Sequence, residues 1–137
     1  MATNDNQRHR MIKKAVMQRP EALVAVTLHL WERLSFELTS IIGEGGFQSL
    51  YARSVHLVRV RYPWIAPIHS SQPSAIAFAS LRSCLEERDL TEINEASVAL
   101  LSTFIDILIM LIGELLTTSI LRSAWGDDVV DIAGKEL

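Results

Sequence analysis

The chain has very little cysteine: Cys84 is the single one among 137 residues. A disulfide within one chain and a cysteine-based zinc site both need more thiols, so both are excluded, and a reducing compartment suits this composition. We therefore expect a cytoplasmic protein. Cys84 shares one face of a predicted helix with Ala77, Leu81 and Leu85, which favours a place in the core over a role as a nucleophile.

An excess of basic charge is also missing, since 13 Lys and Arg stand against 16 Asp and Glu. Nucleic-acid binding draws its affinity from neutralised phosphates, so we expect no nucleic-acid partner. The charge is nevertheless unevenly distributed, with basic residues near the start and acidic residues near the end. Either both ends are simply solvated, or the basic end is an arm that docks on an acidic surface. The basic and acidic residues concerned are Arg8, Arg10, Lys13, Lys14 and Arg19 near the start, and Asp127, Asp128, Asp131 and Glu136 near the end.

No uninterrupted apolar run approaches the ~20 residues that a membrane-spanning helix needs. The most apolar segment, Val98–Leu116, contains Asp106 and Glu114, and a charge at a bilayer centre costs at least ~2.5 kcal/mol. We expect a buried core helix here and no integral membrane protein. Because 49% of the residues are hydrophobic, the chain must bury them thoroughly or share them with another subunit, which favours a homodimer.

Alternation with period two is absent over any useful length, and the β-branched run Val55–Val60 is the one place where a strand remains an alternative. Apolar residues at helical spacing predict helices over residues 7–18, 20–42, 47–62 and 73–88. A long helix follows the Asp-x-x-Glu capping box at Asp89, and a final segment ends near Trp125. The sequence thus predicts an all-α, five- or six-helix bundle over residues 7–126, with a disordered arm at 1–6 and an acidic tail at 127–137.

A weak internal repeat accompanies this pattern. Two Ile-Gly-Glu sequences, at 42–44 and 112–114, lie 70 residues apart, and matching apolar residues precede both. After a one-residue gap an Arg-Ser pair follows each, at 53–54 and 122–123. Either the chain contains two helical hairpins related by a pseudo-twofold axis, or two amphipathic hairpins match by coincidence.

The Ile-Gly-Glu sequences are interpreted as helix junctions, because glycine readily takes the backbone angles that end a helix. Each glutamate would then lie in the first turn of the next helix, where a carboxylate complements the dipole. Structural ion pairs with Arg53 or its counterpart Arg122 are the alternative, and a catalytic carboxylate pair is the least favoured. The predicted junction residues are Gly43, Glu44, Gly113, Glu114 and Arg122.

A cluster of cations gives the best candidate for a binding patch. On a helix Arg53 and His56 share a face, His56 also neighbours Arg59, and Arg61 follows. Such a patch binds phosphate or carboxylate groups. Three possibilities stay open: a solvated or internally paired face, a docking site for an acidic partner, and a site for a small anionic ligand.

The sequence gives little support for metal binding, nucleotide binding, serine hydrolysis or phosphotransfer. His29 precedes Glu32 by three residues, which is a reversed and single version of the Glu-x-x-His pairs of di-iron bundles, so we expect no metal. No glycine-rich nucleotide-binding sequence and no Gly-x-Ser-x-Gly sequence occurs, and we expect no cofactor. Histidine phosphotransfer domains share the size and helicity, but the residues downstream of His29 and His56 do not match their pattern.

The favoured function is therefore a non-enzymatic regulatory or protein-interaction module acting as a homo-oligomer. Its possible interface residues are Trp64 and Ile65 in the proline-rich connector, and Ile105 and Ile109 in the long apolar helix. Two alternatives remain: a small anionic-ligand-binding protein or enzyme with a site between the hairpins, and, less favoured, a phosphotransfer-like signalling bundle.

Overall fold

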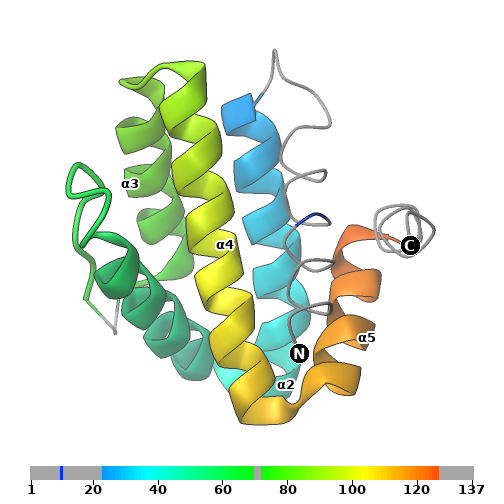
Figure 1. Ribbon diagram of the computed structural model, residues 1–137. Helices are drawn as coiled ribbons and strands as arrows, with labels where there is room; N and C mark the ends of the chain where they lie inside the picture. The colour runs from blue at the N-terminus through cyan, green and yellow to red at the C-terminus, as the bar shows by residue number, and fades with distance from the viewer. Residues whose placement is uncertain (1–9, 11–22, 70–71, 127–137) are drawn as a thin grey trace.

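The computed structural model describes Arg10, residues 23–69 and residues 72–126. These residues form four helices and no strand: α2 (Leu23–Val58), α3 (Ser74–Glu86), α4 (Leu90–Ile112) and α5 (Glu114–Trp125) (Figure 1). The prediction of an all-helical protein is confirmed, and the alternative of a strand at Val55–Val60 is wrong, since α2 continues to Val58.

The predicted count of five or six helices is not confirmed. The helices expected over 20–42 and 47–62 are the two parts of α2, which continues through a kink at Gly43. The helix expected over residues 7–18, the arm at 1–6 and the tail at 127–137 lie outside the described residues.

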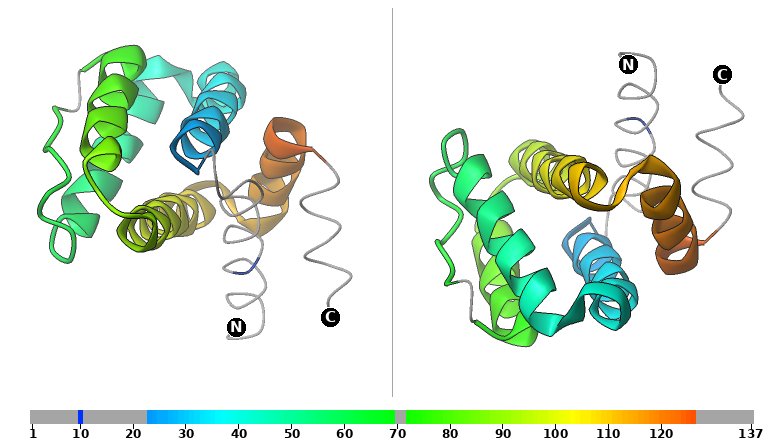
Figure 2. Two further views of the ribbon diagram at one scale, coloured as in Figure 1. Left: turned by 90° about the horizontal axis from the view of Figure 1, so that it is seen from above. Right: turned by 90° about the horizontal axis from the view of Figure 1, so that it is seen from below.

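The first part of α2 and the whole of α4 run side by side through the middle of the bundle (Figures 1 and 2). The second part of α2 and α3 lie on one side of this central pair, and α5 lies on the other side. Both Ile-Gly-Glu junctions are therefore at the same end of the bundle, the lower end in Figure 1. We call this end the tip.

Local chemistry explains where α4 begins and ends. Asp89 caps the helix by accepting a hydrogen bond from the Glu92 amide at 2.9 Å, as the capping-box sequence predicts. At the other end Gly113 has φ 92° and ψ 162°, and its amide donates to the Ile109 carbonyl at 2.8 Å. The chain then turns directly into α5.

The kink in α2 has the same backbone geometry as this break. Gly43 has φ 81° and ψ 164°, a region that is essentially restricted to glycine. Space is not the reason for glycine, because a Cβ built at Gly43 or Gly113 would meet nothing within 4 Å. Both glycines therefore lie where a helix bends or ends, and the need for glycine there is conformational.

An aromatic cluster fills the centre of the core. The Trp31 ring lies 4.9 Å from the Tyr51 ring and 5.1 Å from the Phe104 ring, both edge-on. Phe47 and Phe78 complete the cluster from the second part of α2 and from α3. Edge-to-face pairs add about 0.5–1.5 kcal/mol to the burial of each ring, so this cluster ties the central pair of helices to the α3 side.

Two long-range hydrogen bonds tie α5 to the other side of α2. The Trp125 indole donates to the Leu30 carbonyl at 3.0 Å, and Arg33 donates through Nε to the Ala124 carbonyl at 3.2 Å. One bond runs from an α5 side chain to an α2 carbonyl and the other from an α2 side chain to an α5 carbonyl, so together they fix the end of α5 against α2.

Burial recurs at a constant separation of 70 residues. Every buried position in the first part of α2 has a buried counterpart in α4; the pairs are Leu23 and Ile93, Thr27 and Ser97, Leu28 and Val98, Leu30 and Leu100, Trp31 and Leu101, Leu34 and Phe104, and Leu38 and Leu108. The same separation continues beyond the junctions with Phe47 and Thr117, Leu50 and Ile120, Tyr51 and Leu121, and Ser54 and Ala124. This pattern favours one constant register over the one-residue gap predicted from the Arg-Ser pairs, and it matches Arg53 with Ser123 instead of Arg122.

Candidate functional site

The predicted basic patch divides into two parts. Arg53, His56 and Arg61 are exposed on the outer side of α2 and the turn that follows it. Arg59 instead turns toward the connector and donates through Nε to the Ile65 carbonyl at 2.7 Å. Arg61 lies over the Tyr62 ring, 5.7 Å from its centroid. Arg59 therefore holds the connector in place, and three of the four predicted cations face solvent.

The connector is more firmly packed than its sequence indicates. Ile65 is buried in the core, and Trp64 is half-buried, with the Arg88 guanidinium 4.7 Å from its ring centroid and the Tyr62 ring edge-on at 6.2 Å. The part of Trp64 left for a partner is correspondingly small. Of the predicted connector interface, Ile65 is inaccessible without unfolding.

Cys84 and Tyr51 contribute to the packing of the fold. The Cys84 sulfur accepts a hydrogen bond from the Ala66 amide at 3.4 Å and so links α3 to the connector. Burial raises the pKa of the Tyr51 hydroxyl above its usual range, and the nearby Cys84 thiol adds to this shift. Tyr51 therefore stays neutral at physiological pH, as its place in the aromatic cluster requires.

The junction glutamates lie at the start of helical segments, as predicted. Glu114 is in the first turn of α5, and Glu44 follows the kink in α2. Glu44, Arg53, Glu114 and Arg122 are all exposed. An ion pair among them would be solvated, and such pairs contribute about 0–1 kcal/mol.

A cluster of large apolar side chains is exposed at the tip. It comes from the end of the first part of α2, the end of α4 and the start of α5, which meet there (Figure 1). We call these residues the tip cluster; with their exposed fractions they are Ile41 (49%), Met110 (85%), Leu111 (66%), Leu115 (89%) and Leu116 (44%).

The tip cluster lies next to the predicted helix interface but does not coincide with it. Ile105 is fully buried and Ile109 is half-buried, so the exposed surface begins at Met110. The sequence does carry a signal for it: residues 107–112 are six consecutive apolar residues. A helix that packs on one side can bury only part of such a run, and the remainder must face solvent or a partner.

Polar groups without partners are buried in the centre of the bundle. Within the described residues, Thr27 Oγ1, Trp31 Nε1 and Ser97 Oγ have no hydrogen-bond partner. An unsatisfied buried donor costs about 1–3 kcal/mol, and an orphaned N–H is rare. Thr27 and Ser97 are also counterparts at the separation of 70 residues, so the two central helices carry an equivalent polar position.

The described part of the chain contains no group of three or more His, Cys, Asp or Glu side chains arranged to hold a metal ion. Its one helix long and apolar enough to cross a membrane is α4, and 44% of the most apolar window of α4 is buried inside the bundle. A core helix of a bundle has the same length and composition, so α4 by itself is weak evidence for a membrane span.

Comparison of the chain with protein-family models, with curated proteins and with solved structures found no match.

Proposed function

We propose that the chain is a non-enzymatic, cytoplasmic protein-interaction module that forms a homodimer through the tip cluster. The observation that carries this proposal is the set of five large apolar side chains exposed together at one end of the bundle. Exposed apolar patches mark interaction sites on soluble proteins, and these five residues come from helix ends that meet at the tip. This cluster replaces the interface predicted at Ile65 and Ile105, whose side chains are buried within one copy.

The free energy of burying the tip cluster is comparable to the cost of association. The exposed fractions of the tip cluster together equal roughly three fully exposed side chains, and covering them is worth about 5–9 kcal/mol per copy. A symmetric dimer covers the same surface on both copies and so gains about twice that amount, against an association cost of about 4–15 kcal/mol.

The charge around the tip favours a protein partner over a membrane surface. Residues 34–52 and 103–121, which surround both junctions, contain no Lys or Arg but include Glu37, Glu44, Asp106 and Glu114. Helices that lie on membranes are typically rich in cations, which attract anionic lipids. Carboxylates at the rim of a symmetric dimer repel one another weakly, so salt should strengthen the dimer.

The repeated burial pattern supports a finer proposal for the fold. Two hairpins, each a long helix, an Ile-Gly-Glu junction and a shorter helix, form the bundle as pseudo-twofold-related halves. Three observations support this: the constant separation of 70 residues in burial, the matching φ and ψ of Gly43 and Gly113, and the placement of both junctions at the tip.

The dimer is tested by the molar mass in solution of three forms of the full chain. The wild type should have twice the 15.3 kDa mass of one chain, and Leu115→Glu should have the mass of one chain. Leu90→Glu is the matched control, because Leu90 is 60% exposed at the opposite end of the same bundle, and it should remain dimeric. A monomeric wild type, or equal masses for Leu115→Glu and the wild type, contradicts the proposal, as does flotation of the wild type with neutral lipid vesicles.

A small-ligand-binding protein is the second candidate. It is favoured by the unpartnered Thr27 Oγ1, Trp31 Nε1 and Ser97 Oγ in the core, and not by Arg53 and His56, which face outward. A small polar molecule held there should appear as a retained mass in native mass spectrometry of the purified chain, and Ser97→Ala should reduce its occupancy. Bare chain mass in both proteins would refute this second candidate.

A further inference from the structure

The outer face of the second part of α2 carries cations and apolar side chains together. Five exposed residues lie at spacings of three, four, seven and eight, so they form one continuous face of the helix and of the turn that follows it. We call them the outer stripe; they are Arg53, His56, Leu57, Val60 and Arg61. Val60 is 83% exposed, an unusual exposure for a β-branched apolar residue in the middle of a charged face.

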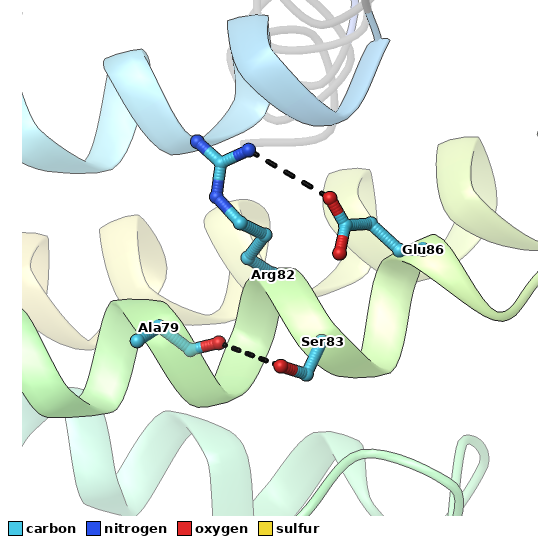
Figure 3. Close-up of polar contacts among 4 residues, drawn as sticks. All are labelled: Ala79, Arg82, Ser83 and Glu86. Carbon is cyan, nitrogen blue, oxygen red and sulfur yellow. Dashed lines mark hydrogen bonds and ion pairs between the residues drawn. The ribbon is translucent and has the colours of Figure 1, made fainter.

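No carboxylate in the surrounding sequence neutralises this stripe. Residues 45–85 contain four arginines and two histidines but no Asp or Glu. On the neighbouring helix, Arg82 is already engaged with Glu86 at 3.8 Å, beside the hydrogen bond from Ser83 to the Ala79 carbonyl (Figure 3). The stripe is therefore a basic surface with no carboxylate in the same stretch of sequence.

The sequence of the same chain contains the complementary chemistry. Asp127, Asp128 and Asp131 come soon after α5 in the sequence, and the apolar residues Val129, Val130 and Ile132 are interspersed with them. The stripe combines Arg53 and Arg61 with Leu57 and Val60 in a similar way. Carboxylates and guanidinium groups form the stronger class of hydrogen bonds, and the aliphatic side chains on both sides offer apolar surface between the charges.

The length of the acidic segment decides whether it can reach the outer stripe of its own copy or only that of a second copy. α5 and the second part of α2 lie on opposite sides of the central helices (Figures 1 and 2). Asp131 is five residues beyond Gly126, which is at most about 18 Å of extended chain. A path around the bundle must pass α5 and at least one central helix, each about 10–12 Å across, so the acidic segment does not reach the stripe of its own copy.

We propose that the outer stripe binds the acidic segment that begins at Asp127 of a second copy. This contact joins two different surfaces, one on each side of the bundle, so it is a head-to-tail contact. It uses surfaces other than the tip cluster, and as an exposed contact it is weaker than the tip contact, so at the protein concentration of the molar-mass measurement the tip cluster alone sets the mass. The outer stripe is thus a recognition site for acidic segments with interspersed aliphatic residues.

The test is a titration of a labelled peptide of residues 126–137 with the full chain, followed by fluorescence anisotropy. The receptor carries Asp127→Asn, Asp128→Asn and Asp131→Asn, so that its own segment does not compete. We expect saturable binding, and Arg53→Glu in the receptor should weaken it about ten-fold, or ~1.4 kcal/mol. Arg82→Glu is the matched control: it makes the same change in charge on an exposed helix outside the stripe and should bind as the parent receptor does.

Two further measurements separate the contribution of charge from nonspecific apolar binding. Val60→Ser should weaken binding several-fold, whereas Ile76→Ser, at an exposed apolar residue on α3, should leave it unchanged. Raising the salt concentration should weaken binding, because exposed charges are screened. Absence of saturable peptide binding, or equal losses from Arg53→Glu and Arg82→Glu, overturns the proposal. Circular dichroism of each receptor checks that the helices are retained.

Discussion

The Gly43 kink gives the sharpest prediction for folding, because the same glycine-rich sequence contains its own control. Gly43 has a positive φ of 81°, whereas Gly45, two residues later, is helical. Neither glycine has a neighbour within 4 Å of a built Cβ. A change to alanine therefore alters backbone preference at both positions without adding a steric contact.

The two substitutions should have opposite signs. At Gly43 the φ and ψ of 81° and 164° belong to a region that costs other residues about 1–3 kcal/mol, so Gly43→Ala should destabilise the fold by that amount. Gly45→Ala should instead stabilise it by up to ~0.5–1 kcal/mol, because alanine is the better helix former and restricts the unfolded chain. Gly113→Ala should resemble Gly43→Ala, since its backbone angles are nearly the same.

The assay is urea unfolding of each full-length variant, followed by circular dichroism at one protein concentration so that self-association is held constant. The difference between Gly43→Ala and Gly45→Ala should be about 1.5–4 kcal/mol in the free energy of unfolding. Equal stabilities for the two variants, or a Gly43→Ala variant more stable than the wild type, would refute the junction as a glycine-dependent kink.

Substitutions at four other residues test the remaining parts of the fold by the same unfolding assay. Asp89→Ala should cost about 1 kcal/mol through loss of the cap on α4, whereas Asp89→Ser should retain most of it; equal losses would contradict the cap. Trp125→Phe should cost about 0.5–1.5 kcal/mol because the Leu30 carbonyl loses its donor, and an unchanged stability would show that this bond does not hold α5. Phe104→Ala should cost about 3–5 kcal/mol, whereas Leu115→Ala, at an exposed position, should change the stability of the monomer by less than ~0.5 kcal/mol.

The local pattern of the sequence was sufficient to predict most helix boundaries. The Asp89 cap, the glycine at 113 and the three-and-four spacing of apolar residues are short-range features, and the structure follows them. The sequence did not predict that two helices would join as α2. A single residue, Gly43 at φ 81°, changes the direction of the helix, and the residues on both sides of it are helical.

Side-chain partners across the bundle were not predictable from local spacing. Arg59 looked equivalent to Arg61, but only Arg59 reaches the Ile65 carbonyl, because the connector folds back onto one side of the turn. The three neighbouring prolines predict an exposed Ile65. It is buried instead, because Arg59 binds its carbonyl and its side chain packs in the core. Such contacts depend on where a segment returns in space, which periodicity does not encode.

The tip cluster illustrates the opposite case, in which the signal was present in the sequence. Six consecutive apolar residues at 107–112 exceed what one side of a helix can bury. Which of them would face outward depended on how the other helices pack: Leu108 is buried, whereas Met110 and Leu111 are exposed next to the junction.

The distance between spin labels at the tip tests the proposed dimer most directly. In a Cys84→Ser background, a label at Leu115→Cys should give an intermolecular distance within about two helix diameters, ~20 Å. A label at Leu90→Cys, 21 residues before Leu111 along α4 and so about 30 Å from the tip, should give a clearly longer distance. Short distances between Leu90→Cys labels, or no intermolecular distance from Leu115→Cys, would contradict association through the tip cluster.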